Sequence, residues 1–538
     1  MTRFQLTAAA AALLLVGCPA PDGAGSGGSG PVGTPGLKTL VFGRGQESVT
    51  LDPANATDGE SVKVIVNVFD TLVRYAEGST QVEPSLAEKW DVSEDRLTWT
   101  FTLREGATFH DGSPVDAEAV VFSMERQRDP EHPFHQGEFV YWNDQFGAVR
   151  SVEASDPRTV VFQLSEPFVP FLQNLAMFSA SIVCPSEFTR LQEAGTKDVG
   201  AAFAIAPVGS GPFKFKEWRP SEALILEAFD AYWGGRPKLD EVIFRAIGDN
   251  NSRLQLLKKG ELHGMDGINP ADVQGLEQED SIELHLLKPG SNTAYLAFNN
   301  LKEPFTDPRV RRACAMALNL EKVASSLYYG LAVPAKNLLP PTIRGYNDAL
   351  PAREQDKEGA KKLLAEAGFP DGFESTVWVF TNPRPYMPQP SKTAQYVKNA
   401  LAQIGVKVEV VTKEWASYLE EVEKAEHDMA FMGWSSDNGD PDNFLYVLLS
   451  KHSTKEGSAS NISFYRSDMV TTLLEDARKE FDPAQRDALY QKAQAQIYED
   501  VPMVPLVHNV FVVAMRKEVK GFTMHPLNEL RFHKVDLE

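Results

Sequence analysis

The chain contains 538 residues, more than a single compact core usually accommodates, so two or three domains are expected. Its 43% hydrophobic and 24% charged residues are typical of an ordinary folded protein. The formal net charge of −21 argues against a nucleic-acid partner, because phosphate binding requires a basic surface.

The N-terminus is expected to be a targeting segment rather than part of the fold. Arg3 precedes an apolar run at residues 8–16, which is too short to span a bilayer as a stable anchor. The run ends in Leu15-Val16-Gly17-Cys18, which resembles the lipobox of bacterial lipoproteins and implies cleavage before Cys18 and lipidation of its sulfur. The alternative is ordinary secretory cleavage near Ala20. The Gly-, Ser- and Pro-rich residues that follow indicate a flexible tether.

The first half of the folded chain is predicted to contain both strands and helices. Residues 97–104 alternate large apolar side chains with polar ones, which predicts a strand with one buried face. Asp116 is the predicted N-cap of the helix that follows it. The other predicted elements are a strand at 38–43, turns at 51–53, 57–60 and 109–112, helices at 61–72, 167–178 and 252–260, and strands at 159–164, 223–227 and 241–246.

The stretch Gly209-Ser210-Gly211-Pro212-Phe213 interrupts this pattern. Two glycines and a proline suit a crossing between domains or a close approach of one backbone to another.

The second half alternates helices and strands more regularly. Asp307 and Pro308 are expected at the cap and first turn of a helix. Such alternation predicts an α/β domain with a mostly parallel sheet. Residues 503–515 are expected to be extended and to return to the first domain. The elements behind this prediction are strands at 293–298, 375–380, 406–411 and 429–432 and helices at 357–367, 391–404, 415–425 and 483–498.

Two cysteines remain after Cys18, namely Cys184 and Cys314. A disulfide between them is chemically allowed in an exported protein. Both lie in apolar surroundings, and Cys314 shares the apolar face of its helix, so two buried thiols are expected.

Two loops that follow predicted strands carry the candidate ligand-binding residues. One is the stretch from Phe431 to Asn443, which contains Asp437, and the other is Arg384-Pro385-Tyr386. Strand ends that open into loops commonly hold ligand groups. An arginine and an aspartate on two such loops suit the two charged ends of a zwitterion.

Five stretches resemble the family 5 extracellular solute-binding proteins of ABC importers. They are the stretches 86–112, 209–213, 232–234, 294–311 and 431–443. The resemblance extends from about Lys38 to the C-terminus and is strongest to the dipeptide-binding members. It implies that Arg384 holds the carboxylate of a peptide and that Asp437 holds its ammonium group. The disulfide cysteines of those members have no evident counterparts here, so the resemblance does not imply a stabilising bridge in this chain.

The resemblance also implies the fold class and its division. The expected fold is α/β, a two-lobed periplasmic-binding-protein fold (type II-like) with an extra subdomain, three domains in all, closing on the ligand. The expected parts are a signal peptide at 1–17, a lipidated cysteine and linker at 18–37, lobe I at 38–70, 209–290 and 508–538, subdomain Ib at 71–208 and lobe II at 291–507.

Further residues are expected to line the ligand site or to support the loops that form it. Trp434 and Tyr386 either line a pocket for a ligand side chain or pack in the hydrophobic core. Asp440 and Asp442 are read as turn formers beside Pro441. The spacing of carboxylates differs from that of a calcium loop, and no metal ligand or cofactor is expected. The full set of expected ligand-binding residues is Arg384, Asp437, Trp434, Tyr386, Gly433, Asp58 and Gly59.

Two functions from different classes follow. The first is a lipid-anchored, monomeric receptor at the periplasmic or cell-surface side of a bacterial membrane, delivering short peptides to the permease subunits of an ABC importer. The second is an exported hydrolase acting through Asp437 and another carboxylate. Within the first class, other expected solutes are oligopeptides, glutathione, haem, nickel or sugars.

Overall fold

The computed structural model describes residues 36–136 and 139–538, together with the backbone but not the side chain of Asp144. Cys18 and the expected signal peptide therefore lie outside the described residues. The described part contains a seven-stranded, a six-stranded and a four-stranded sheet and two small two-stranded sheets. The two-stranded sheets pair β2 (Val73–Tyr75) with β3 (Val82–Pro84) and β20 (Val519–Lys520) with β21 (Asp536–Leu537).

The seven-stranded sheet gathers segments from both ends of the described chain. Its central strand β1 (Thr39–Arg44) is fully buried and pairs in parallel with β10 (Glu241–Ala246) and β11 (Gly264–Met265). The remaining strands are β8 (Phe213–Arg219), β9 (Ala223–Ala228), β12 (Ile282–Leu287) and β19 (Phe511–Arg516), and the helices of this region are α1 (Gly59–Val68), α7 (Asn250–Lys259) and α8 (Val273–Leu276).

Helix α1 starts and ends earlier than predicted. Asp58 is its N-cap and Gly59 its first residue, so the expected turn at 57–60 is wrong. The predicted continuation to residue 72 is also wrong, because Phe69 is extended and Gly211 N–H donates to the carbonyl of Val68 at 2.9 Å. A Cβ at Gly209 would lie 2.1 Å from that same carbonyl oxygen. The glycines thus allow the close backbone approach that the sequence indicated.

The four-stranded sheet is antiparallel and follows the predicted alternation. Trp99, Phe101 and Leu103 are buried on one face of β5. Asp116 caps α2 through Ala119 N–H, as predicted. The strands are β4 (Ala87–Val92), β5 (Thr98–Leu103), β6 (Val149–Asp156) and β7 (Thr159–Leu164), with α2 (Ala117–Arg128), α3 (Val140–Gln145), α4 (Phe171–Asn174), α5 (Pro185–Glu193) and α6 (Val199–Ile205).

The predicted helix at 167–178 is wrong in extent. Only α4 (Phe171–Asn174) and a short 3-10 turn at Phe178–Ala180 form. Val169 N–H donates to the carbonyl of Arg478, far along the chain, and Met177 is extended. Tertiary contacts therefore replace the helical hydrogen bonds at both ends of this segment.

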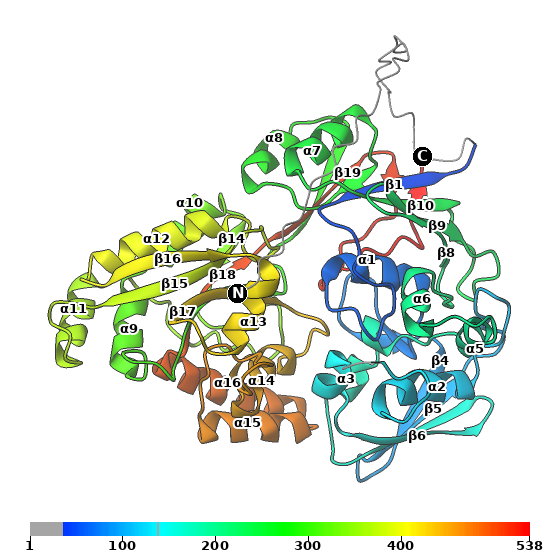
Figure 1. Ribbon diagram of the computed structural model, residues 1–538, viewed down its shortest axis with the longest axis horizontal. Helices are drawn as coiled ribbons and strands as arrows, with labels where there is room; N and C mark the ends of the chain where they lie inside the picture. The colour runs from blue at the N-terminus through cyan, green and yellow to red at the C-terminus, as the bar shows by residue number, and fades with distance from the viewer. Residues whose placement is uncertain (1–35, 137–138) are drawn as a thin grey trace, which may run out of the picture. The chain divides into compact units, whose positions relative to one another are not determined.

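The six-stranded sheet is mixed rather than mostly parallel, which corrects the prediction. β15 (Glu374–Phe380) runs parallel to β16 (Lys407–Lys413) and β17 (Met429–Ser435). β13 (Asn292–Phe298) is antiparallel to β17 and β18 (Met503–Asn509), and β18 is antiparallel to β14 (Ala332–Pro334). Helix α12 runs alongside β15 and β16 (Figure 1). The helices here are α9 (Pro308–Met316), α10 (Leu320–Leu327), α11 (Lys357–Glu366), α12 (Pro390–Ala402), α13 (Trp415–Glu423), α14 (Asp442–Leu449), α15 (Asp468–Lys479) and α16 (Pro483–Asp500).

The chain passes twice between the seven-stranded and six-stranded sheets. The first passage is residues 288–291, between β12 and β13, and the second is Val510, between β18 and β19 (red in Figure 1). Residues 503–515 are extended, as expected, but only 511–515 lie in the seven-stranded sheet, since 503–509 belong to the six-stranded one. The domain boundaries set out from the sequence stay a prediction.

Both described cysteines are free thiols, as expected. Cys314 lies in the largest buried apolar cluster, with the strands of the six-stranded sheet. Cys184 lies in the cluster beneath the four-stranded sheet.

Candidate ligand-binding site

The two loops that carry Arg384 and Asp437 leave the same edge of the six-stranded sheet. β15 and β17 are parallel, with Val377 opposite Met429 and Trp378 opposite Ala430. Their carboxyl ends therefore point the same way, and each continues directly into one of the two predicted loops.

Arg384 lies in a tight turn that holds its guanidinium against an aromatic ring. Backbone hydrogen bonds join Arg384 and Met387 in both directions, at 3.1 and 2.9 Å. The guanidinium carbon lies 3.6 Å from the ring centroid of Trp415, the first residue of α13. Its Nε is buried and has no hydrogen-bond partner among the described residues. The arginine is therefore oriented by stacking, and one of its buried donors is available to an acceptor.

Burial dominates the electrostatics of Arg384. It lowers the pKa of the guanidinium, while negative charge on Tyr386 and Asp58 would raise it. Asp58 accepts from Ser61 N–H at 2.9 Å and from Ser61 Oγ at 2.6 Å as the cap of α1. The charge of Asp58 thus acts on the guanidinium of Arg384, while the carboxylate of Asp58 is hydrogen-bonded to Ser61. Gly59 forms the first turn of α1, and a Cβ there would meet no atom within 4 Å.

Asp437 is held from two parts of the chain. Asn443 Nδ2 donates to its Oδ2 at 3.0 Å, and Tyr141 Oη donates to its Oδ1 at 3.2 Å. Tyr141 belongs to α3, beside the four-stranded sheet. Asn443 Oδ1 in turn accepts from Asp437 N–H and from Trp434 Nε1, both at 3.0 Å. Asn443 therefore fixes the loop and the half-buried Trp434 together.

The remainder of this loop also contacts residues distant in sequence. Asn438 Nδ2 donates to Asn174 Oδ1 at 2.7 Å, with both side chains fully buried. Gly439 has φ of +74°, and a Cβ there would lie 2.5 Å from Thr80 Cβ. The loop that carries Asp437 is thus in direct contact with the segment that forms the four-stranded sheet.

Asp440 and Asp442 do more than form a turn. Asp440 Oδ1 accepts from Asp442 N–H at 2.9 Å, as a turn former would. Asp440 also pairs with Arg486, and Asp442 lies 3.3 Å from Arg478. Burial raises the pKa of Asp442 to about 6, against the lowering effect of Arg478. These two arginines anchor the loop to α15 and α16.

Gly433 and Tyr386 fit against each other. A Cβ at Gly433 would lie 2.2 Å from Tyr386 Cδ2 and 2.6 Å from the carbonyl oxygen of Thr293. Tyr386 is 8% exposed, and its hydroxyl lies 3.8 Å from Met432 Sδ. Because Gly433 has no side chain, the ring of Tyr386 packs directly against its backbone and is buried beside the turn that contains Arg384.

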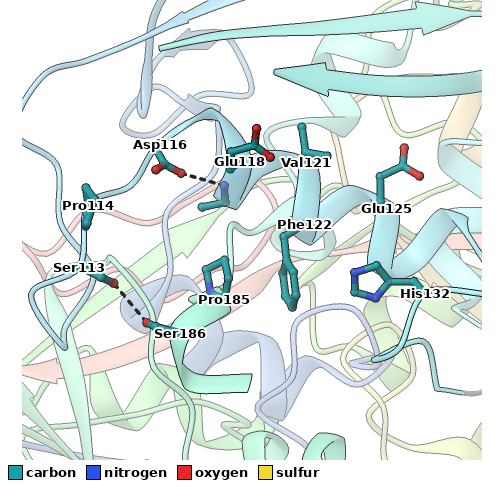
Figure 2. Close-up of a pocket in the computed structure, with 11 residues that line it drawn as sticks. Ser113, Pro114, Asp116, Glu118, Val121, Phe122, Glu125, His132, Pro185 and Ser186 are labelled. Carbon is teal, nitrogen blue, oxygen red and sulfur yellow. Dashed lines mark hydrogen bonds between the residues drawn. The ribbon is translucent and has the colours of Figure 1, made fainter. Parts of the chain in front are cut away.

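A separate surface pocket of about 500 Å³ lies beside α2 and α5 (Figure 2). Two of the carboxylates that line it already have partners, since Asp116 caps α2 and Glu125 binds Arg128. His132 lies at one end, with its ring against Phe122. No predicted ligand residue lines this pocket. The described residues also contain no cluster of metal-type ligands, and none of their helices is long and apolar enough to cross a membrane.

Comparison with known proteins places these features in a family. The family described as bacterial extracellular solute-binding proteins, family 5 Middle, matches residues 81–456. This chain belongs to that family. The dipeptide-binding protein of Escherichia coli (strain K12) is 36% identical over 93% of this chain and 95% of its own length. Heme-binding protein A of Haemophilus influenzae is 34% identical over 100% of this chain and 99% of its own.

A solved family structure supports the fold assignment. The ABC transporter-associated periplasmic binding protein DppA of Helicobacter pylori, in complex with the peptide STSA, matches with a TM-score of 0.85 and 38% identity over 93% of this chain and 98% of that one. The two-lobed α/β fold expected from the sequence is confirmed. Members of the family bind solutes and are not enzymes, so the hydrolase hypothesis is dropped.

Four residues of this family member were not singled out from the sequence. Asn443 was noted only as the end of the loop, and Trp415 only as the start of a helix. Tyr141 is separated from Asp437 by 296 positions, and no local pattern links them. Asn509, which bonds the Arg384 turn, is the last residue of the buried strand β18 and follows another polar residue, His508.

Proposed function

We propose that this chain is the lipid-anchored binding component of an ABC importer and takes up dipeptides or other short peptides by their charged ends. The observation that carries the proposal is the placement of Arg384 and Asp437 on loops leaving the carboxyl ends of two parallel strands, each side chain fixed by its own partners.

Arg384 would bind the carboxylate of the peptide. A guanidinium is planar and can donate to both oxygens of a carboxylate. The guanidinium lies against the ring of Trp415, and the buried Nε of Arg384 lacks a partner among the described residues, so a bound carboxylate would satisfy this donor.

Asp437 would bind the ammonium group. Asn443 donates to its Oδ2 and Tyr141 to its Oδ1, and an ionised carboxylate is purely an acceptor, which suits the donors of an ammonium group. A cation beside this carboxylate would be bound by charge as well as by hydrogen bonding, in a position fixed by Asn443.

Fixing both charged ends gives tolerance of side chains with selection for length. The relatives named above include a protein named for dipeptides and one bound to the four-residue peptide STSA. The proposal is therefore a short peptide, with a dipeptide as the ligand that best uses both charges. Trp434, Tyr386, Gly433, Asp58 and Gly59 would frame the space between them.

Haem is the second candidate, favoured by the relative named for it, which matches over the whole chain. Haem carries two carboxylates and no ammonium group. It would therefore depend on a cation such as Arg384 but not on Asp437.

Cys18 would anchor the protein at the periplasmic or cell-surface side of the membrane, near the permease subunits. The tether at residues 18–37 would let a monomer reach them.

The test is calorimetry of a soluble form with a free dipeptide, its C-terminal amide and its N-acetyl form. Arg384→Ala should weaken the free dipeptide by roughly 30- to several-thousand-fold, because an unpaired buried ligand charge costs about 2–5 kcal/mol. The amide should be affected little by Arg384→Ala, and the N-acetyl form little by Asp437→Ala.

Arg344→Ala and Asp487→Ala are matched controls, because these residues pair with each other at the surface. They should leave all three affinities unchanged. Equal binding of blocked and free peptides by the wild type would overturn the proposal. Tight haem binding that survives Asp437→Ala would favour the second candidate.

A further inference from the structure

The two passages between the large sheets are tied together by a pair of asparagines. Asn509 N–H donates to Asn292 Oδ1 at 3.0 Å, and Asn292 Nδ2 donates to the carbonyl of Asn509 at 2.9 Å. Gly290 N–H donates to the same carbonyl at 2.9 Å. Both side chains are buried, at 0% and 6% exposure. The last residue of β18 and the first of β13 are thus locked to each other where the chain leaves the six-stranded sheet.

There is little room for rearrangement at this point. A Cβ at Gly290 would lie 2.5 Å from Asn292 Nδ2 and 2.7 Å from the carbonyl oxygen of Asn509. His508 also bonds the carbonyl of Asn292, at 2.9 Å. The two passages are therefore joined directly by hydrogen bonds.

The side chain of Asn509 reaches from this junction to the ligand site. Its Nδ2 donates to the carbonyl oxygen of Pro385, the residue after Arg384. Pro385 lies inside the turn closed by the Arg384–Met387 hydrogen bonds. The Oδ1 of Asn509 is buried without a hydrogen-bond partner among the described residues, so Pro385 is the only hydrogen-bond partner of this amide there.

We propose that Asn509 is a positioning residue that couples the inter-sheet junction to Arg384. It holds the Arg384 turn in the geometry that receives a carboxylate, and movement of the sheets at the two passages alters that geometry. The idea rests on the proposed function, since it assumes that Arg384 binds the ligand carboxylate. Asn509 itself touches no ligand.

The test is a double-mutant cycle between Asn509→Ala and Arg384→Ala, read by calorimetry with a free dipeptide and with its C-terminal amide. Asn509→Ala should weaken the free dipeptide about 2- to 10-fold, as expected for the loss of one buried hydrogen bond. The amide should change less than twofold. In the Arg384→Ala background, Asn509→Ala should have no further effect on the dipeptide.

The matched control is Asn300→Ala, which removes an asparagine just after β13 that bonds the carbonyls of Phe298 and Ser463. It should lower the thermal stability without changing the ratio of dipeptide to amide affinity. If Asn509→Ala does not fold, Asn509→Ser, which keeps a short donor, should give a smaller loss of the same kind.

The outcomes distinguish the proposed role of Asn509 from the proposed role of Arg384 in binding the carboxylate. Equal weakening of dipeptide and amide by Asn509→Ala, or full additivity with Arg384→Ala, would overturn the coupling alone. Failure of Arg384→Ala to distinguish dipeptide from amide would overturn the proposed function instead.

Discussion

Asp440 and Arg486 form a bidentate ion pair in the interior, with Nη1 2.7 Å from Oδ2 and Nη2 2.8 Å from Oδ1. Arg486 also donates to the hydroxyl of Tyr490 at 3.0 Å. This pair joins the loop that carries Asp437 to helix α16. Both side chains are nearly inaccessible to solvent. Each buried charge is therefore stabilised mainly by the opposite charge of its partner.

Arg486→Ala should therefore destabilise the protein by about 3–5 kcal/mol, because it leaves Asp440 buried without its partner. Denaturant unfolding at neutral pH measures this. The double variant Asp440→Ala/Arg486→Met should recover part of the loss. Arg309→Ala breaks an exposed pair with Asp307 and should cost about 0–1 kcal/mol. A loss for Arg486→Ala no larger than for Arg309→Ala would contradict this account.

Tyr141→Phe should weaken binding of a free dipeptide about 2- to 10-fold, since it removes one hydrogen bond to Asp437. It should also diminish the decrease in radius of gyration that we expect when ligand binds, because Tyr141 contacts Asp437 from the segment of the four-stranded sheet. Calorimetry and small-angle scattering measure the two effects. Tyr329→Phe, at a residue 50% exposed, is the control. A scattering profile unchanged by saturating ligand in the wild type would count against closure.

Gly433→Ala should destabilise the protein by about 1–3 kcal/mol, because the added methyl group meets the ring of Tyr386 and the backbone of Thr293. Displacing Tyr386 should also disturb the neighbouring Arg384 and weaken peptide binding. Gly275→Ala is the matched control, since a Cβ there meets no atom within 4 Å. Thermal unfolding and calorimetry on both variants test the prediction. Equal stability of the two would show that Tyr386 can move freely.

His427→Gln should make the protein less sensitive to acid. Burial lowers the pKa of His427 to about 4, from an ordinary value of 6.5, and its Nε2 lies 2.9 Å from the carbonyl oxygen of Ile462. Between pH 6.5 and 4 the unfolded chain binds this proton and the folded chain does not. The contribution of neutral His427 to the free energy of unfolding is therefore present in full above pH 6.5. It decreases as the pH falls towards 4, by up to about 3 kcal/mol.

Denaturant unfolding at several pH values from 7 to 4 measures this effect. The free energy of unfolding of His427→Gln should fall less over that range than that of the wild type. His452→Gln, at an exposed histidine, is the control for loss of an imidazole. Identical pH dependence of wild type and His427→Gln would contradict the prediction.

Cys18→Ala should release the mature protein from membranes into the soluble fraction, because the lipid would be lost with the sulfur. Membrane fractionation and electrophoretic mobility measure this. A variant that stays membrane-bound with unchanged mobility would show that Cys18 is not the anchor.

Local signals in the sequence predicted local structure well. The alternation through Trp99, Phe101 and Leu103 predicted β5, and Asp116 and Asp307 predicted two helix N-termini. Each of these patterns is satisfied within a few residues of itself. The resemblance to a known family predicted the fold and directed attention to the two strand-end loops.

The predictions of secondary structure were wrong where segments distant in sequence form hydrogen bonds with the same backbone groups. The helix expected to reach residue 72 stops at Val68, because the backbone N–H of Gly211 donates a hydrogen bond to the carbonyl of Val68. The sheet expected to be mostly parallel is mixed, because β13 and β18 enter it at the two passages from the seven-stranded sheet. Likewise, the bond from Tyr141 to Asp437 depends on tertiary packing that no spacing along the chain encodes.

The two buried thiols give this protein an unreactive background for labelling chemistry. Burial raises the pKa of Cys314 to about 12 and also raises that of Cys184, and only a thiolate reacts readily with a maleimide. In a form that begins after Cys18, a dye would therefore attach only at cysteines introduced on the surface. Val140 in α3 and Met469 in α15 are 50% and 57% exposed and offer two such positions. Single-molecule energy transfer between dyes at these two positions would measure changes in the distance between α3 and α15.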